Sequence, residues 1–191
     1  MKLRIATLVA VLALAASSAF AAGTQWIAVN GGAGFPSSDL SDAAETGWLA
    51  GVGYGYSLNE KFALGADVSY NGLGKKTIGT VDVQPTIWQY TAQGYWMIPM
   101  SGKSQFPYVK VGVGGYNFDS DQAGQGSKTK FGANAGLGWN KALKGKTSFG
   151  LDGAYHWIDS GSDFKTASGS DATLSYFTVS AHVGWALGGS Q

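Results

Sequence analysis

Residues 62–71 read Phe62-Ala63-Leu64-Gly65-Ala66-Asp67-Val68-Ser69-Tyr70-Asn71. Every second side chain, from Phe62 to Tyr70, is apolar, whereas the intervening positions are small or polar and include Asp67. Alternation with a period of two predicts a β-strand with one apolar face and one polar face.

The same alternation recurs along the chain and predicts about eight strands, at 24–35, 46–58, 62–72, 81–97, 106–119, 128–140, 146–158 and 171–187. The fourth segment is the weakest, because its alternation changes phase between Val83 and Trp88. Pro85 cannot donate a ladder hydrogen bond, so we expect a β-bulge there.

The connections between these strands alternate in length. Short ones are expected near 59–61, 98–105 and 142–145, and longer polar ones near 36–45, 73–80, 120–127 and 159–170. Short turns at one end and long loops at the other are typical of a transmembrane β-barrel. We therefore predict an all-β fold, a single eight-stranded antiparallel up-and-down transmembrane barrel.

The first 21 residues resemble a secretory signal peptide. Lys2 and Arg4 precede an apolar stretch, and Ala19-Phe20-Ala21 has the small-x-small pattern that a signal peptidase recognises. We expect cleavage after Ala21, a barrel domain over 22–191 and export to a Gram-negative outer membrane. The alternative is an uncleaved anchor, for which the apolar stretch is short.

Charged residues make up 13% of the chain, about half the usual share in soluble domains. A soluble barrel with its apolar face inside would present an exterior of Gly, Ser and Asn with almost no charge, which disfavours that alternative. Without the predicted signal peptide the chain has no arginine and a formal charge of −1. The composition therefore does not suggest a nucleic-acid partner, and no cysteine is available for disulfides.

Aromatic residues gather at the two ends of the predicted strands. We expect them at the short-turn end (Trp26, Tyr56, Phe62, Trp96, Phe106, Trp139, Phe149 and Trp185) and at the long-loop end (Phe35, Trp48, Tyr70, Phe118, Phe131 and Trp157). Two such belts are typical of membrane barrels, in which amphipathic rings lie at headgroup depth. The girdle residues that we predict are Trp48, Tyr56, Tyr70, Trp96, Trp139, Trp157 and Trp185.

The glycine-laced strands give the chain a family resemblance. Gly51-Val52-Gly53-Tyr54-Gly55-Tyr56, residues 107–114 and Leu137-Gly138-Trp139 resemble strands of small outer-membrane barrels, which include the opacity proteins, the Ail/OmpX-like surface proteins and the OmpA barrel domain. The resemblance implies a non-catalytic structural or surface-interaction role. We expect a monomer in contact with outer-membrane lipids, lipopolysaccharide and, during biogenesis, the barrel-assembly machinery.

Five polar residues are expected inside the barrel at similar heights: Asp67, Gln93, Lys110, Asn134 and Asp152. A lysine between two aspartates predicts an ion-paired structural cluster that fills a narrow lumen. The alternatives are an ion or proton relay and, because the inner face is rich in glycine, a narrow channel for small solutes.

His156 and His182 are the residues that an enzyme would use, with Ser180 nearby, since some small outer-membrane barrels modify lipid A. A last hairpin turning near residue 165 would place Asp152 opposite Thr178, His156 opposite Leu174 and His182 opposite Ser148. The histidines would then lie about 27 Å apart, too far for a catalytic triad.

We expect neither a cofactor nor a bound metal. Asp119-Ser120-Asp121 lacks the remaining ligands of a calcium-binding loop, and the glycines at 51–55 are not followed by the helix that a phosphate-binding loop requires.

Overall fold

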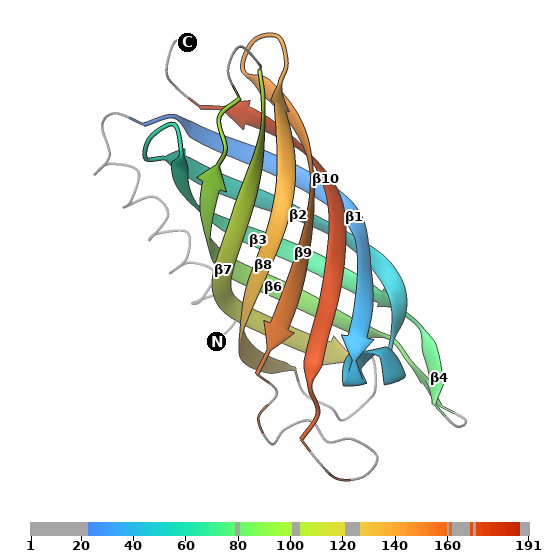
Figure 1. Cartoon of the computed structure of the whole chain (residues 1–191). Helices are drawn as coiled ribbons and strands as arrows, with labels where there is room; N and C mark the ends of the chain where they lie inside the picture. The colour runs from blue at the N-terminus through green and yellow to red at the C-terminus, as the bar shows by residue number, and fades with distance from the viewer. Residues whose placement is uncertain are drawn as a thin grey trace.

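The computed structural model describes residues 23–78, 81–100, 104–120, 127–159, 161, 169 and 171–187. The predicted signal peptide and its cleavage site lie outside the described residues. Eight long strands form a closed barrel (Figure 1): β1 (Gln25–Ser38), β2 (Glu45–Ser57), β3 (Phe62–Gly74), β6 (Pro85–Met97), β7 (Gln105–Ser120), β8 (Lys128–Ala142), β9 (Thr147–Ile158) and β10 (Leu174–Ala186). The prediction of an eight-stranded antiparallel barrel is confirmed.

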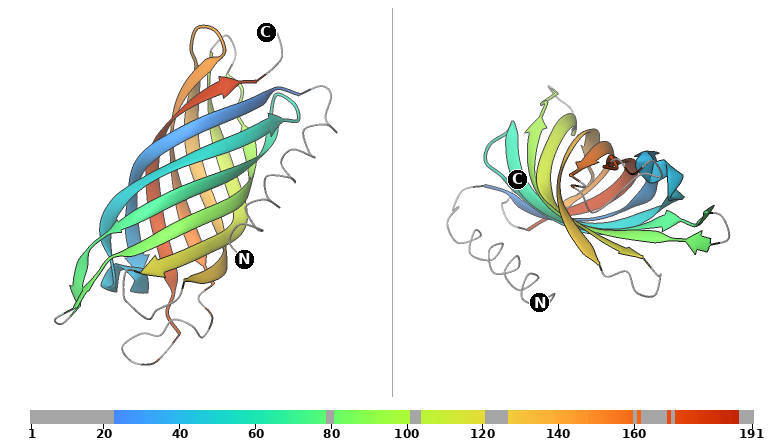
Figure 2. Two further views of the ribbon diagram at one scale, coloured as in Figure 1. Left: turned by 180° about the vertical axis from the view of Figure 1, so that it is seen from behind. Right: turned by 90° about the horizontal axis from the view of Figure 1, so that it is seen from below.

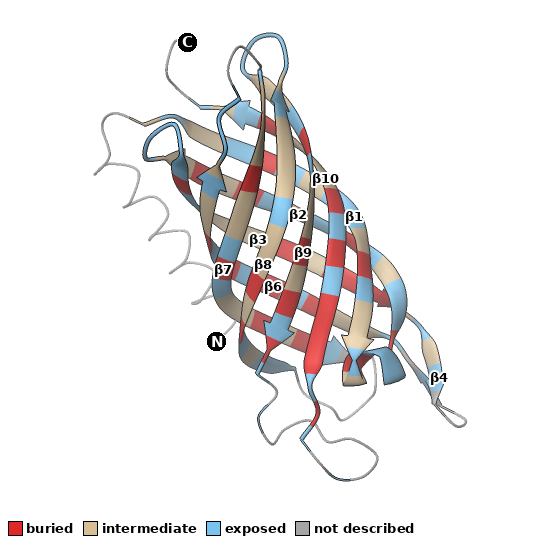
Figure 3. Cartoon of the chain, viewed as in Figure 1, coloured by how far each residue is buried: buried red, intermediate tan, exposed pale blue. Residues whose placement is uncertain are grey.

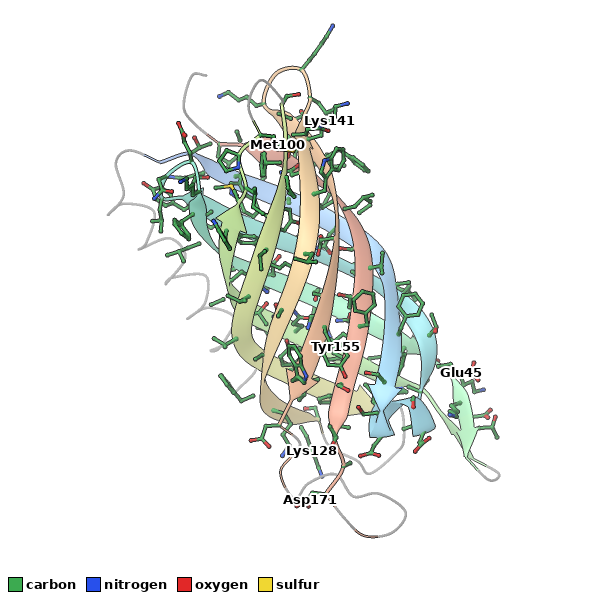
Figure 4. The ribbon with its side chains drawn as sticks, viewed as in Figure 1. Glu45, Met100, Lys128, Lys141, Tyr155 and Asp171 are labelled. Carbon is green, nitrogen blue, oxygen red and sulfur yellow. The ribbon has the colours of Figure 1, made fainter. Side chains whose placement is uncertain are left out.

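Each long strand pairs with its neighbour in sequence, and β10 returns to pair with β1 from Trp26↔Ala186 to Ser38↔Leu174. The short turns lie at one end of the barrel with Met100 and Lys141, whereas Glu45, Lys128 and Asp171 lie toward the other end (Figure 4). These are the short-turn end and the long-loop end below.

The expected bulge at Pro85 is not observed. The segment divides instead into β5 (Val81–Val83) and β6, and β5 pairs with β4 (Lys76–Ile78) in a separate hairpin. This hairpin projects beyond the barrel (Figure 2). Pro85 begins β6, a position where its missing donor does not interrupt the ladder. The irregularity lies in β2, where the register with β3 shifts between Glu45 and Trp48.

The register of the last hairpin also differs from the prediction. Asp152 lies opposite Ser180, His156 opposite Tyr176 and His182 opposite Gly150, two residues from the expected partners. A shift of two residues keeps every side chain on its predicted face and changes only its height. The two histidines are separated by six residues along the ladder, about 20 Å rather than 27 Å.

The two faces of the barrel have opposite character, which appears as alternating exposed and buried bands along the strands (Figure 3). The outer face exposes large apolar side chains such as Val111 (56%), Leu137 (69%) and Phe131 (64%). No helix among the described residues is long and apolar enough to cross a membrane.

The interior changes along the barrel axis. Near the long-loop end, a buried apolar cluster fills it, and this cluster includes Leu40 and Ala44 from the 3-10 helix η1 (Asp39–Asp42) and its flank. Buried polar side chains form a second zone, among them Gln89, Thr91 and Asn134. Toward the short turns the interior is hollow.

Candidate functional site

The hollow part of the lumen is a cavity of about 950 Å³, which we call the vestibule. Its lining extends from Asn59 and Gly145 in the short turns down to Asp67, Lys110 and Asp152. The vestibule is large enough for a drug-sized molecule, since ligand sites commonly occupy about 300–1,000 Å³.

Asp152 organises the charged floor of the vestibule. Its Oδ1 accepts a hydrogen bond from the Lys110 ammonium in an ion pair, and its Oδ2 accepts from the Ser180 hydroxyl at 3.1 Å. His182 Nδ1 lies 3.3 Å from the same Oδ2. One carboxylate thus joins strands β7, β9 and β10, and its charge is paired as a buried charge must be.

Asp67 is separate from that pair. Its Oδ2 accepts a hydrogen bond from the Tyr95 hydroxyl at 3.1 Å, and no cation of the described residues lies within 4.0 Å of its carboxylate. A Cβ at Gly53 would come within 2.7 Å of Asp67 Oδ1, so the glycine in β2 makes room for this carboxylate. Only one of the two predicted aspartates therefore pairs with Lys110.

Tyr95 also belongs to an aromatic wall above the floor. Its ring meets Trp26 edge to face at 5.6 Å and Tyr108 at 5.8 Å. All three rings line the vestibule together with Phe106. The vestibule therefore combines an aromatic wall with a charged floor.

Gln93 and Asn134, predicted to join the charged residues, lie in the polar zone instead. Gln93 Nε2 donates to Thr91 Oγ1 at 2.9 Å, whereas Asn134 Nδ2 lies 3.5 Å from the Tyr116 hydroxyl. The side-chain oxygens of both amides are buried and accept no hydrogen bond from the described residues. The structure thus divides the five predicted residues between two zones.

His156 is fully engaged in that zone. The Tyr116 hydroxyl lies 3.0 Å from its Nδ1, and its Nε2 lies 3.2 Å from Thr178 Oγ1. Thr178 in turn donates to the Ala154 carbonyl, so Nε2 is assigned the proton and Nδ1 accepts from Tyr116. His156 is 4% exposed.

The Ser180, His182 and Asp152 side chains meet, which the predicted register did not anticipate. Ser180 donates directly to Asp152, and His182 bonds the same carboxylate oxygen. In a catalytic triad the histidine stands between serine and carboxylate and accepts the serine proton. This arrangement instead places the carboxylate between the other two, and Ser180 donates to Asp152 rather than to His182.

The long-loop end of the lumen is closed by side chains. Leu73, Ile87, Tyr116 and Tyr176 are completely buried there, and Leu40 from η1 packs into the same cluster. The backbone N–H of Thr173 donates to Asp39 Oδ2 at 2.6 Å, which ties η1 to the start of β10.

The predicted girdle residues lie on the outer face. Trp48, Trp96 and Trp157 are each at least half exposed, Trp185 is 39% exposed, and Tyr56, Tyr70 and Trp139 are half-buried. Near the long loops, Tyr70 lies 5.2 Å from Trp48 and 5.1 Å from Trp88 between ring centroids.

Three aromatics assigned to the belts face inward instead. Trp26 and Phe106 line the vestibule, and Phe118 is buried in the apolar cluster. Each of the three is an odd number of residues from an exposed residue in its own strand, Ile27 in β1 or Val111 and Val113 in β7. This parity indicated an inward position, which their place at strand ends obscured.

The β4–β5 hairpin has its own polar contacts. Lys75 Nζ lies 2.6 Å from Asp82 Oδ2, and the Thr77 hydroxyl donates to Asp82 Oδ1 at 2.7 Å. These hydrogen bonds, that from Lys75 first, hold the pKa of Asp82 below its usual value of 3.8. Lys76 bonds the Ser41 carbonyl at 2.5 Å.

Sequence reasoning missed Tyr95, Tyr108 and Tyr116 as interior residues. Each of them directly precedes an outward-facing residue, which is Trp96, Val109 and Asn117 respectively. Alternation along the strand could therefore have predicted their inward orientation. In the part of the chain that the structure describes, no group of three or more His, Asp or Glu side chains has the arrangement of a metal site. Asp121, part of the weak calcium motif, lies outside the described residues.

A closed antiparallel barrel with an apolar exterior, a polar interior and aromatic residues near both ends belongs to the class of transmembrane β-barrels. The sequence model of the protein family described as outer membrane protein beta-barrel domain matches residues 6–186, and the chain belongs to this family. It is accordingly an outer-membrane protein of the Gram-negative type.

Solved structures show the same fold. Neisserial surface protein A is 14% identical, with a TM-score of 0.68 over 85% of this chain and 97% of that one. The outer membrane protein AlkL is 16% identical (TM-score 0.52, 91% and 96% covered), and OprG from Pseudomonas aeruginosa is 15% identical (TM-score 0.51, 87% and 98% covered). No curated protein sequence matches this chain.

Proposed function

We propose that this barrel is a non-catalytic, non-conducting scaffold in the outer membrane, and that its long-loop end contacts other molecules at the cell surface. The observation that carries the proposal is the apolar closure of the lumen. Leu40, Leu73, Ile87 and Tyr176 are at most 4% exposed and fill the barrel where a pore would have to pass. Small polar solutes would lose their hydration in this cluster, which disfavours the channel alternative.

Catalysis has less support than a scaffold role. His156 is buried with both ring nitrogens bonded, and Ser180 donates to Asp152 rather than to His182. A lipid-modifying serine would need a histidine within hydrogen-bond reach of its hydroxyl. Replacement of both histidines should therefore leave the lipid A composition unchanged.

The surface role rests on the elements that extend beyond the membrane-spanning strands. The β4–β5 hairpin is held by the Lys75–Asp82 ion pair and by the bond from Thr77. A rigid scaffold that carries polar connections is the usual setting for recognition. Lipids and lipopolysaccharide would surround the girdle. Assembly by the outer-membrane machinery, a monomeric state and removal of residues 1–21 complete the proposal.

Two experiments test it. Planar-bilayer recordings should give conductance at background, and stable unitary currents would overturn the non-conducting role. The surface phenotype that cells lose when the gene is deleted should be restored by the intact gene. It should not be restored by a version in which a Gly-Gly-Ser linker replaces residues 75–83. Replacement of Lys141 and Lys144 by alanine, at the short-turn end, is the matched control. Full complementation by the linker variant would remove the hairpin from the proposed contact surface.

A further inference from the structure

The vestibule contains more negative than positive charge. Among the described residues Asp67 and Asp152 face one ammonium, that of Lys110, and Lys110 forms its ion pair with Asp152. At the mouth, Glu60 and Lys146 have opposite charges. The floor of the vestibule therefore has two carboxyl groups and one ammonium group, and among the described residues no salt bridge joins a cation to the second carboxyl group.

Asp67 is that carboxylate. The Tyr95 hydroxyl occupies its Oδ2, and Oδ1 lies against Gly53. A carboxylate removed from bulk water gains most from a cationic partner that also donates hydrogen bonds. Within the described residues such a partner is missing, although the cavity beside Asp67 has room for one.

The wall beside Asp67 suits the same kind of partner. Trp26, Tyr95 and Tyr108 form a chain of edge-to-face rings, and the ring of Tyr95 is held by its bond to Asp67. Aromatic faces attract ammonium groups and provide apolar contact for the carbon body that carries them.

We propose that the vestibule is a binding site for a small organic ammonium compound, with its charged group at Asp67 and its apolar body against Trp26, Tyr95 and Tyr108. The ligand would enter from the short-turn end, which faces the periplasm in transmembrane barrels of this type. The apolar cluster beyond the polar zone would keep it from passing through the barrel.

The experiment compares three probes of nearly equal size: 2-phenylethylammonium, 2-phenylethanol and phenylacetate. Each is titrated calorimetrically into the full barrel folded in lipid nanodiscs. We expect the ammonium compound to bind at least about tenfold more tightly than the alcohol, and phenylacetate to bind most weakly. Equal affinities, a preference for phenylacetate or no binding of any probe would overturn the proposal.

Asp67→Asn removes the charge with little change in volume and should reduce the affinity for the ammonium compound to that for the alcohol. Asp82→Asn makes the same charge change on the exposed hairpin and should leave all three affinities unchanged. A charge preference that survives in Asp67→Asn would show that Asp67 is not the partner.

Location is tested separately, in case Asp67→Asn does not fold. Of the seven tryptophans, all within the described residues, only Trp26 lines the vestibule. Ligand-dependent quenching of tryptophan fluorescence should therefore disappear in Trp26→Phe. Ala142→Trp, which adds bulk to the lining near the short turns, should abolish binding. Unchanged affinity in Ala142→Trp would place any bound probe elsewhere.

Discussion

The ring of His156 lies flat against the ring of Tyr176, with centroids 4.4 Å apart and planes 4° from parallel. The two residues face each other across β9 and β10. Tyr176 donates to Gln89 Oε1 at 2.9 Å, and His156 connects Tyr116 with Thr178. This stack therefore lies where the apolar cluster meets the polar zone, and it links four strands.

Replacing His156 with leucine should destabilise the barrel. The substitution leaves the buried hydroxyls of Tyr116 and Thr178 without the imidazole partner, so we expect a loss of about 2–4 kcal/mol in unfolding free energy. Urea unfolding in lipid vesicles, followed by tryptophan fluorescence, measures it. Lys141→Leu, on the exposed short-turn side, is the control and should change little. Equal stability of both variants would contradict the structural role of His156.

An arginine on the outer face should be costly only at membrane depth. Val113 lies in the middle of β7 and is 49% exposed, whereas Leu143 is 47% exposed in a short turn. Val113→Arg should cost about 2–4 kcal/mol and Leu143→Arg at most about 1 kcal/mol, because the bilayer penalty falls toward the interface. The same unfolding assay compares them. Similar costs at the two sites would mean that the apolar band does not contact lipid.

Alternation predicted the strands and faces well for a physical reason. Lipid outside and a lumen lined by small and polar side chains inside impose a period of two on each membrane-spanning strand, so Val111 and Lys110 are assigned to opposite faces from the sequence alone. Height along the axis is different. A register shift of two residues leaves every side chain on the same face, so alternation cannot detect it. For this reason the predicted partner of Asp152 was Thr178, whereas the observed partner is Ser180.

That limit explains which parts of the candidate site could be foreseen. The inward orientation of Asp67, Lys110 and Asp152 follows from parity, whereas the pairing of Lys110 with Asp152 depends on register and tilt. The aromatic wall was missed because Trp26 lies at a strand end, where an aromatic residue can belong either to an outer belt or to the lumen. Only the parity of neighbouring Ile27, 40% exposed, separates the two.

The pKa of Asp82 should depend on Lys75. Their hydrogen bond lowers the pKa, so the ionised carboxylate stabilises the β4–β5 hairpin at pH values above about 3.8, and this contribution is lost as the pH falls through the lowered pKa. Lys75→Met should raise the pKa of Asp82 toward 3.8, measured by NMR titration of its carboxyl carbon. Lys141→Met, at the opposite end, should not. An unchanged pKa in Lys75→Met would assign the shift to Thr77 instead.

Two adjacent glycines in β1 should respond oppositely to alanine. A Cβ at Gly32 would overlap the Val179 carbonyl oxygen and lie 2.7 Å from Ser180 Cα, whereas at Gly31 the nearest atom is the Leu49 carbonyl oxygen at 3.8 Å. Gly32→Ala must therefore push β1 away from β10, the pair of strands that closes the barrel. We expect it to cost about 1–3 kcal/mol, in the range of overpacking.

Gly31→Ala meets no such overlap and restricts the unfolded chain, so we expect it to be neutral or to stabilise by up to about 1 kcal/mol. Unfolding free energies in the same vesicles measure both changes, and the shift in gel mobility on boiling reports whether each barrel closes. Because the two glycines are neighbours in one strand, strand propensity and membrane depth are nearly matched between them. A cost for Gly31→Ala equal to that for Gly32→Ala would therefore contradict close approach of β1 and β10 as the reason for glycine at position 32.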